Sequence, residues 1–250
     1  MIEAIAVYTI WLREVKRYFR AKERVIGSIA QPIFWFLIFG IGLGRSIQFT
    51  GLSVDYFSFI TPGIVGMSLL FVSIFSGVSV IWDREFGFLK EILVAPVSRL
   101  SIVAGKALGG ATTAAIQGIL ILMISLVLGA NIPVQSVLLM IPLMVVISIG
   151  FVCLGLAIAS LMDTMEGFQL IMNFVVQPMF FLSGALFPLQ SLPEWLRIVT
   201  YLDPMTYCVE VLRYVTTGFS SFNITVSVVF ILAFAASMSA FASWTFGRRK

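Results

Sequence analysis

Five long stretches of this chain contain no charged side chain. The charge-free windows cover residues 25–44, 56–82, 107–162, 167–193 and 214–247. A helix needs about 20 mostly apolar residues to cross the hydrocarbon of a bilayer, and an ionised group at its centre costs roughly 2.5 to 3.5 kcal/mol on insertion scales. Each window is long enough and free of such groups, so the sequence predicts an integral membrane protein with several crossings.

Composition disfavours the main soluble classes. Only 11% of the residues are charged and 60% are hydrophobic, whereas a soluble domain carries about 25% charged residues. The chain has no histidine, and Cys153 and Cys208 lie far apart, so we expect no metal site, no Cys/His dyad and no disulfide framework. The basic residues flank apolar windows, and nucleic acid is therefore not an expected partner. We predict one membrane domain, residues 1–250, with no catalytic residues.

The windows divide into six predicted transmembrane helices of an all-α, polytopic fold. The longest window is interrupted by Gly129-Ala130-Asn131-Ile132-Pro133, a turn composition that ends one helix before the next begins. The predicted spans are residues 26–44, 57–81, 107–128, 136–161, 168–187 and 223–246.

Lysine and arginine fall almost entirely on one side of these helices. Six crossings place both termini on the same side, which then carries 13 basic residues, while the other side carries three: Arg45, Arg197 and Arg213. Because basic residues accumulate on the cytoplasmic side, both termini are predicted to be cytoplasmic. The expected location is the cell (plasma or inner) membrane.

Residues 1–24 are predicted to form an amphipathic interfacial helix. Apolar residues recur at spacings of three and four: Ile5, Tyr8, Leu12, Val15 and Phe19. The opposite side is basic: Arg13, Lys16, Arg17 and Arg20. Such a helix lies along the membrane surface with its apolar face among the acyl chains. A simple topology signal explains the same residues equally well.

Residues 82–106 are predicted to be the longest cytoplasmic loop. A short helix could run from Glu85 to Val94 and end before Pro96. One of its faces would carry three apolar side chains: Phe86, Leu89 and Leu93. An apolar stripe edged by charge is typical of a docking surface for a soluble partner. A helix that only lies on the membrane is the alternative.

Residues 188–214 suit neither a full span nor an open loop. The chain turns at two prolines, Pro188 and Pro193. The apolar run that follows is too short to cross and is broken at Asp203-Pro204, so we predict a re-entrant or interfacial helical hairpin on the external side. Four aromatic residues would lie at head-group depth: Trp195, Tyr201, Tyr207 and Tyr214. Glu210 and Arg213, three residues apart, could pair on one helical face as structural support.

Four groups of residues, in this order along the chain, carry a resemblance to a known family. They are Gln31-Pro32 with Phe39-Gly40-Ile41-Gly42-Leu43-Gly44; Tyr56, Phe59, Pro62 and Gly63; Glu85, Gly87, Leu89, Glu91, Leu93, Pro96 and Arg99; and Phe181-Leu182-Ser183-Gly184 with Phe187-Pro188, Leu192-Pro193, Trp195-Leu196, Pro204, Thr206-Tyr207 and Arg213. Over nearly its whole length the chain resembles the membrane subunit (permease) of a type-2 ABC transporter, of the drug-resistance and nodulation-type exporters.

This resemblance implies partners that hydropathy alone does not show. Family members pair as dimers with two copies of a separate ATPase subunit, which binds the ATP and magnesium; this chain would bind no cofactor. Residues 83–99 would be the coupling helix. Its contacts with the ATPase would be Asp83, Glu85, Phe86, Gly87, Leu89, Glu91, Leu93, Pro96 and Arg99. Phe88 stands where a small polar residue is common. The chain contains no GxxxxGK phosphate-binding loop, so it is not expected to hydrolyse ATP itself.

The implied mechanism is ATP-driven export along a central path between two protomers of a homodimer. Because no charged side chain is expected in the spans, the path would be lined by apolar and neutral polar groups. Four polar candidates are Gln31, Asn173, Gln177 and Ser183. Such a surface suits an amphiphilic, lipid-linked or hydrophobic substrate. The alternatives are an ATP-independent facilitator or channel and a membrane-embedded lipid-modifying enzyme, which would need clustered reactive groups.

Overall fold

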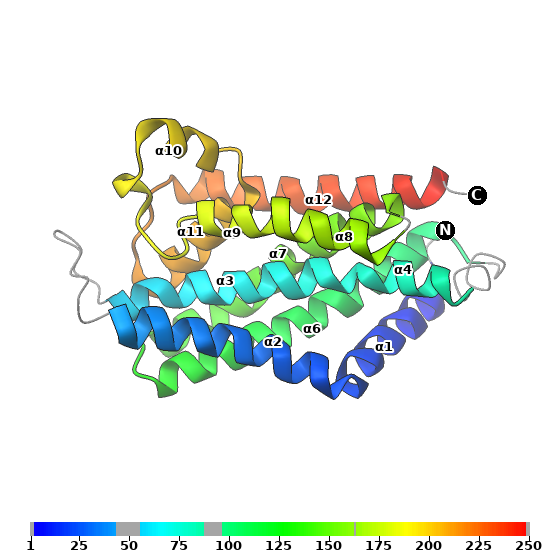
Figure 1. Ribbon diagram of the computed structural model, residues 1–250, viewed down its shortest axis with the longest axis horizontal. Coiled ribbons are helices and arrows are strands. Elements are labelled where there is room, and N and C mark those ends of the chain that lie inside the picture. The colour runs from blue at the N-terminus through cyan, green and yellow to red at the C-terminus, as the bar shows by residue number, and fades with distance from the viewer. Residues whose placement is uncertain (1–2, 44–55, 88–96, 163, 249–250) are drawn as a thin grey trace.

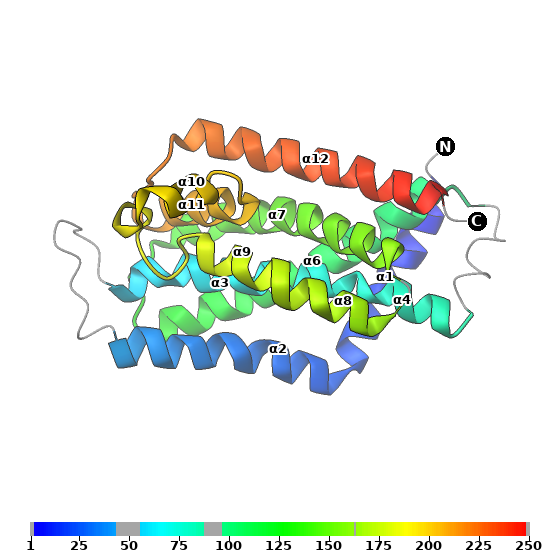
Figure 2. The same cartoon turned by 45° about the horizontal axis from the view of Figure 1, so that its top comes forward.

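Long helices lying side by side form most of the molecule. The computed structural model describes residues 3–43, 56–87, 97–162 and 164–248, and within these ranges helices are joined by turns and short irregular segments, without strands. The longest helices lie along the length of the bundle (Figures 1 and 2): α3 (Tyr56–Ser76), α6 (Arg99–Val127), α7 (Val134–Leu161) and α12 (Ile224–Arg248). The predicted all-α class is confirmed.

The N-terminal segment forms two helices with different directions. Helix α1 (Ala4–Arg20) ends where Ala21 leaves helical geometry, at ψ 75°. Helix α2 (Lys22–Trp35) then continues as a π-helical segment, η1 (Phe36–Leu43). Figure 1 shows α1 inclined to the rest of the bundle, at the end where both chain termini lie. Termini at one end agree with an even number of crossings, and their cytoplasmic location stays a prediction.

The charged segment 82–106 is more helical than predicted. After a break at Gly77, helix α4 (Val78–Glu85) prolongs α3, and α6 already begins at Arg99. Glu85 therefore closes a helix instead of starting one. Residues 88–96, the remainder of the predicted short helix, lie outside the described residues. The helices extend beyond the charge-free windows because the charges near their ends find partners in neighbouring helices, as detailed below.

Within the residues that the structure describes, four helices are long and apolar enough to cross a membrane. They are Tyr56–Glu85, Arg99–Val127, Val134–Leu161 and Ile224–Phe246, and a shorter apolar helix covers Val25–Gly40. The predicted fifth span is divided into α8 (Met165–Ile171), the π-helical η2 (Met172–Val176) and α9 (Gln177–Leu182). A multi-pass membrane protein is thus supported, and the count of six spans stays a prediction.

Two short helices occupy the segment predicted to form a hairpin. The turn η3 (Leu189–Ser191) leads to α10 (Glu194–Thr200) and α11 (Pro204–Thr217). Asp203 caps α11, because its side chain accepts a hydrogen bond from the Met205 backbone N–H at 2.9 Å. Gly218, with φ 72°, ends the helix in the left-handed conformation that glycine adopts easily. Figure 1 places α10 at the end of the bundle opposite the termini.

Helices α3, α4 and α7 meet in backbone contact. A Cβ atom on Gly77 would lie 2.4 Å from the carbonyl group of Gly155, and one on Gly155 would lie 2.4 Å from the carbonyl oxygen of Ile74. In both cases the nearest atoms belong to the backbone, which cannot move aside as the end of a flexible side chain can. Small residues at such a crossing let two membrane helices approach closely.

Replacing Gly155 with alanine is expected to destabilise the protein by about 1 to 3 kcal/mol, the usual cost of overpacking a filled interior. The midpoint of thermal unfolding of the purified protein in detergent would measure it. Gly27→Ala is the matched control, because a Cβ there would meet nothing within 4 Å. Equal midpoints for the two variants would contradict the close crossing.

Candidate functional site

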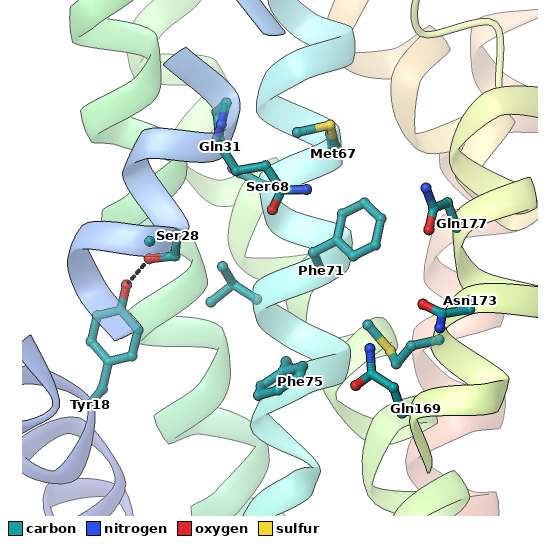
Figure 3. Close-up of a pocket in the computed structure, with 14 residues that line it drawn as sticks. Tyr18, Ser28, Gln31, Met67, Ser68, Phe71, Phe75, Gln169, Asn173 and Gln177 are labelled. Carbon is teal, nitrogen blue, oxygen red and sulfur yellow. Dashed lines mark hydrogen bonds between the residues drawn. The ribbon is translucent and has the colours of Figure 1, made fainter. Parts of the chain in front are cut away.

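A cavity lies between α2, α3 and the run from α8 to α9. Its volume is about 370 Å³, within the range of roughly 300 to 1,000 Å³ that is typical of small-molecule sites. Figure 3 shows α3 at its centre, with α2 on one side and the α8–α9 run on the other. The lining residues are Tyr18, Gly27, Ser28, Gln31, Pro32, Met67, Ser68, Phe71, Val72, Phe75, Gln169, Met172, Asn173 and Gln177.

Four carboxamide side chains line this cavity. Gln31 comes from α2, and the other three recur every fourth residue along α8, η2 and α9: Gln169, Asn173 and Gln177. This spacing places the three amides on one helical face. In Figure 3 they extend from that face toward α3. None of the lining residues carries a formal charge, so the cavity offers neutral hydrogen-bond donors and acceptors.

Helix α3 contributes the apolar part of the lining. Met67, Phe71 and Phe75 follow one another at helical spacing and lie on the cavity side of the helix (Figure 3). Phe71 also packs edge-on against Phe180, with ring centroids 6.3 Å apart. The cavity therefore combines an aromatic wall with a row of amides, an arrangement that can bind an amphiphilic molecule along its length.

The sequence located part of this lining. Three of its four polar candidates, Gln31, Asn173 and Gln177, surround the cavity. Ser183 is buried elsewhere, and its hydroxyl donates to the Phe180 carbonyl at 2.6 Å. Gln169 was missed, although the four-residue spacing from Asn173 could have identified it.

Helix α1 reaches the cavity through a buried hydrogen-bond network. The Tyr18 hydroxyl donates to Gln117 Oε1 and lies 3.2 Å from the Ser28 hydroxyl. Ser28 also donates to Gln117 Oε1 at 2.8 Å, and the Gln117 amide donates to the Ser28 carbonyl. Tyr18 and Ser28 line the cavity as well. The three side chains join α1, α2 and α6 at the edge of the cavity.

One turn before Tyr18, α1 enters a cluster of charged side chains. The Asp83 carboxylate accepts from Lys106 Nζ at 2.7 Å, from Arg13 at 2.8 Å and from Arg17 at 3.3 Å. Glu14 accepts from Arg17 at 2.6 Å and from Lys106 at 3.2 Å. We call these five residues the charge cluster. It joins α1, α4 and α6.

The charge cluster lies just beyond the charge-free windows, inside helices that continue past the predicted ends of the spans. Lys106 and Asp83 are only 2% and 4% exposed, and both lie in helices long enough to cross a membrane. Burial of single charges is costly, but paired and hydrogen-bonded charges are tolerated. The sequence missed the cluster because Arg13, Asp83 and Lys106 are far apart along the chain.

The residues predicted to contact an ATPase fall into three groups. Asp83 is occupied by the charge cluster, and its burial disfavours a direct contact with another protein. The second group is exposed at helix ends: Glu85 is the last residue of α4, Phe86 and Gly87 follow it, and Arg99 begins α6. Phe86 is 83% exposed, and Gly87 adopts the left-handed conformation at φ 73°. The third group lies outside the described residues: Leu89, Glu91, Leu93 and Pro96.

A second group of buried polar side chains lies at the end of the bundle opposite the charge cluster. Arg213 and Glu210 are fully buried and form the predicted pair, with 2.8 Å between Arg213 Nη1 and Glu210 Oε1. Arg213 Nη2 also donates to the Gly184 carbonyl at 2.6 Å, and its guanidinium carbon lies 4.0 Å from the centre of the Phe59 ring. Glu210 Oε2 accepts from the Ser220 hydroxyl at 3.1 Å. The pair therefore links α11 to α3 through Phe59, and to the two connecting segments that contain Gly184 and Ser220.

The aromatic residues of the predicted hairpin differ in their environment. Trp195, Tyr201 and Tyr214 are exposed, as head-group contacts would require. Tyr207 is buried instead, because its ring stacks on Phe230 with centroids 4.0 Å apart and its hydroxyl donates to the Tyr201 carbonyl. Among the prolines, Pro188 is buried, Pro204 is partly buried in the first turn of α11, and Pro193 is exposed.

Asp203 is a buried carboxyl group at the start of α11. Burial raises the pKa of Asp203 to about 7, and its hydrogen bonds from Met205 and Thr206 offset only part of that effect. Asp203 acts as a helix cap and does not approach the cavity. Among the described residues, no group of three His, Cys, Asp or Glu side chains is placed to hold a metal ion.

Comparison with known proteins adds an independent observation. The sequence profile of the family described as "ABC-2 type transporter" matches residues 5–217. The chain is 30% identical to the putative transport permease ycf38 of Cyanophora paradoxa, over 88% of this chain and 83% of the relative. It is 29% identical to the inner membrane transport permease YadH of Escherichia coli strain K12, over 92% and 91%. It is 28% identical to nodulation protein J of Rhizobium meliloti, over 83% and 81%.

Proposed function

The chain belongs to the ABC-2 type transporter family and is a membrane transport permease, and we propose that it is the membrane subunit of an ATP-driven exporter. ATP would be hydrolysed, with magnesium, in a separate ATPase subunit. Two copies of the permease would assemble with two copies of that ATPase. Both chain termini would lie in the cytoplasm.

The observation that carries this proposal is the continuous connection between an exposed helix end and the cavity. Glu85 and Phe86 stand exposed at the end of α4. Two residues earlier, Asp83 binds α1 through Arg13 and Arg17, and α1 reaches the cavity through Tyr18. A force applied by a partner at Glu85 and Phe86 would therefore reach the cavity wall through rigid helices and charge-assisted hydrogen bonds.

The cavity lining favours a substrate with both polar and apolar parts. Its four amides can exchange hydrogen bonds with a neutral polar group, while the aromatic side chains of α3 accept an apolar one. An amphiphilic, lipid-linked or hydrophobic molecule meets these conditions. An inorganic ion fits poorly, because no formal charge faces the cavity and its desolvation would be uncompensated.

The neighbourhood of the cavity also supports a dimer. Apolar side chains near it are exposed on α2 and η2, including Phe34 at 57% and Phe174 at 76%. A second copy packed against this side would cover them and enclose the cavity between two protomers. The substrate path would then run between the two copies.

The coupling proposal predicts that Glu85→Lys abolishes most ATP turnover when the permease is produced with its ATPase and reconstituted in liposomes. Charge reversal at an exposed contact weakens association and leaves the fold intact, because Glu85 is exposed. Glu91→Lys tests the adjoining segment in the same way.

Glu166→Lys serves as the matched control, since Glu166 is also an exposed acid near the start of a helix, α8. Unchanged complex formation and turnover in the Glu85 and Glu91 variants would refute the coupling proposal. Substrate flux in vesicles that contain no ATPase subunit would instead indicate a facilitator or channel.

A further inference from the structure

Helix α1 presents three different faces along its length. The inward face packs on α6, where Gly105 and Gly109 leave room for it: Val7, Ile10, Trp11, Glu14 and Tyr18. An apolar face points away from the bundle, with Ile5 83% and Tyr8 59% exposed: Ile5, Tyr8, Leu12, Val15 and Phe19. Between them runs a basic face: Arg13, Lys16, Arg17 and Arg20.

The basic face forms a groove of about 460 Å³ that holds no acidic side chain. Its lining consists of Thr9, Leu12, Arg13, Lys16, Arg17 and Arg20. Four cations therefore line the same groove, together with one hydroxyl and one apolar side chain. Lys16 and Arg20 are exposed, and in the described part of the structure neither makes a hydrogen bond or an ion pair.

The acids of the charge cluster do not neutralise this groove. Asp83 and Glu14 provide two negative charges, whereas Arg13, Arg17 and Lys106 already provide three positive ones. Lys16 and Arg20 add two more positive charges. The groove and the charge cluster together therefore carry an excess of three positive charges. A phosphate group would bind several of these donors at once, because guanidinium groups form bidentate, charge-assisted hydrogen bonds with phosphate oxygens.

We propose that this groove binds the phosphate of an anionic phospholipid from the adjacent membrane leaflet. The exposed apolar face of α1 adjoins the groove along the same helix, so an acyl chain could lie on Ile5, Tyr8 and Phe19 while its head group meets the cations. A free phosphate or an acidic protein surface would use the cations but leave the apolar face uncovered. Because Arg13 and Arg17 also bind Asp83, the lipid would stabilise the attachment of α1 to α4 and α6.

The test measures thermal unfolding of the full-length protein, purified in a non-ionic detergent, with added phosphatidylglycerol or phosphatidylcholine of identical acyl chains. A ligand that binds the folded state raises the midpoint of unfolding. Phosphatidylglycerol is expected to raise it by several degrees more than phosphatidylcholine. The double variant Lys16→Gln/Arg20→Gln should lose at least half of this difference and keep the wild-type midpoint without lipid.

Two control variants separate the site from general charge effects. Lys22→Gln removes an exposed cation just outside the groove, and Lys16→Arg/Arg20→Lys retains both charges; both should respond to phosphatidylglycerol like the wild type. An undiminished response in Lys16→Gln/Arg20→Gln would overturn the proposal. An equal rise of the unfolding midpoint with inorganic phosphate alone would also overturn it. So would a Lys16→Gln/Arg20→Gln variant that releases the ATPase subunit but keeps its full response to phosphatidylglycerol.

Discussion

Replacing Arg213 with methionine is expected to destabilise the protein by about 3 to 5 kcal/mol, the usual effect of removing one member of a buried ion pair. Arg213 and Glu210 are both fully buried. Without the guanidinium group, the Glu210 carboxylate would remain in the interior with only hydroxyl and backbone donors, from Ser220 and Ser221. The Gly184 carbonyl would also lose its donor. Thermal unfolding in detergent and the yield of monodisperse protein would measure the loss.

The double variant Glu210→Gln/Arg213→Met separates two causes of the destabilisation: the unpaired charge of Glu210 and the lost packing of the Arg213 side chain. A glutamine keeps an acceptor for the same donors but carries no charge, so the double variant should be more stable than Arg213→Met alone. Arg197→Met is the matched control, because Arg197 lies in the neighbouring helix α10 but is only partly buried. If the double variant were no more stable than the single one, the buried charge would not be the cause.

The second large effect is expected for Asp83→Asn, which should destabilise the protein by about 3 kcal/mol. The change removes the one carboxylate that Lys106, Arg13 and Arg17 share, and the new amide group would place a donor opposite cations. The two arginines are about one third exposed, so water compensates part of the loss. Release of α1 should also speed tryptic cleavage after Arg13 and Arg17.

Glu85→Gln is the control for stability. It also neutralises a carboxylate, two residues after Asp83, but Glu85 is exposed. Exposed substitutions of this kind usually change stability by less than about 0.5 kcal/mol. A midpoint of unfolding for Asp83→Asn equal to that of Glu85→Gln would show that the charge cluster does not hold α1 in place.

Features that depend on neighbours in the sequence were predicted well. The pairing of Glu210 with Arg213 followed from their spacing of three residues on one helix, and the break at Asp203-Pro204 followed from the chemistry of a helix start. Asn173 and Gln177 were predicted only as polar side chains in a charge-free span, and the structure places both in the lining of one cavity. Where the environment comes from another helix, the sequence contained no sign of it: Tyr207 was predicted only to lie at head-group depth, and its ring stacks on Phe230 in α12.

The ends of the helices were misjudged for a related reason. Hydropathy assigns every charge the cost of an isolated ion, and so it ended the second span before Asp83 and began the third after Lys106. In the folded chain these two side chains lie 2.7 Å apart, and the helices continue through them. The predicted loop 82–106 was therefore too long at both ends.

The sequence by itself determined that this chain is a helical membrane protein, and its ordered motifs indicated the family. Both conclusions rest on properties of single segments: the transfer free energy of an apolar window and the identity of residues at fixed spacing. Only the tertiary structure decided which charges are buried, which amides share a cavity and which cations of α1 remain unneutralised. Arg13 and Asp83 are 70 residues apart in the chain, and the energy of a buried charge depends on partners that folding alone brings within hydrogen-bond distance.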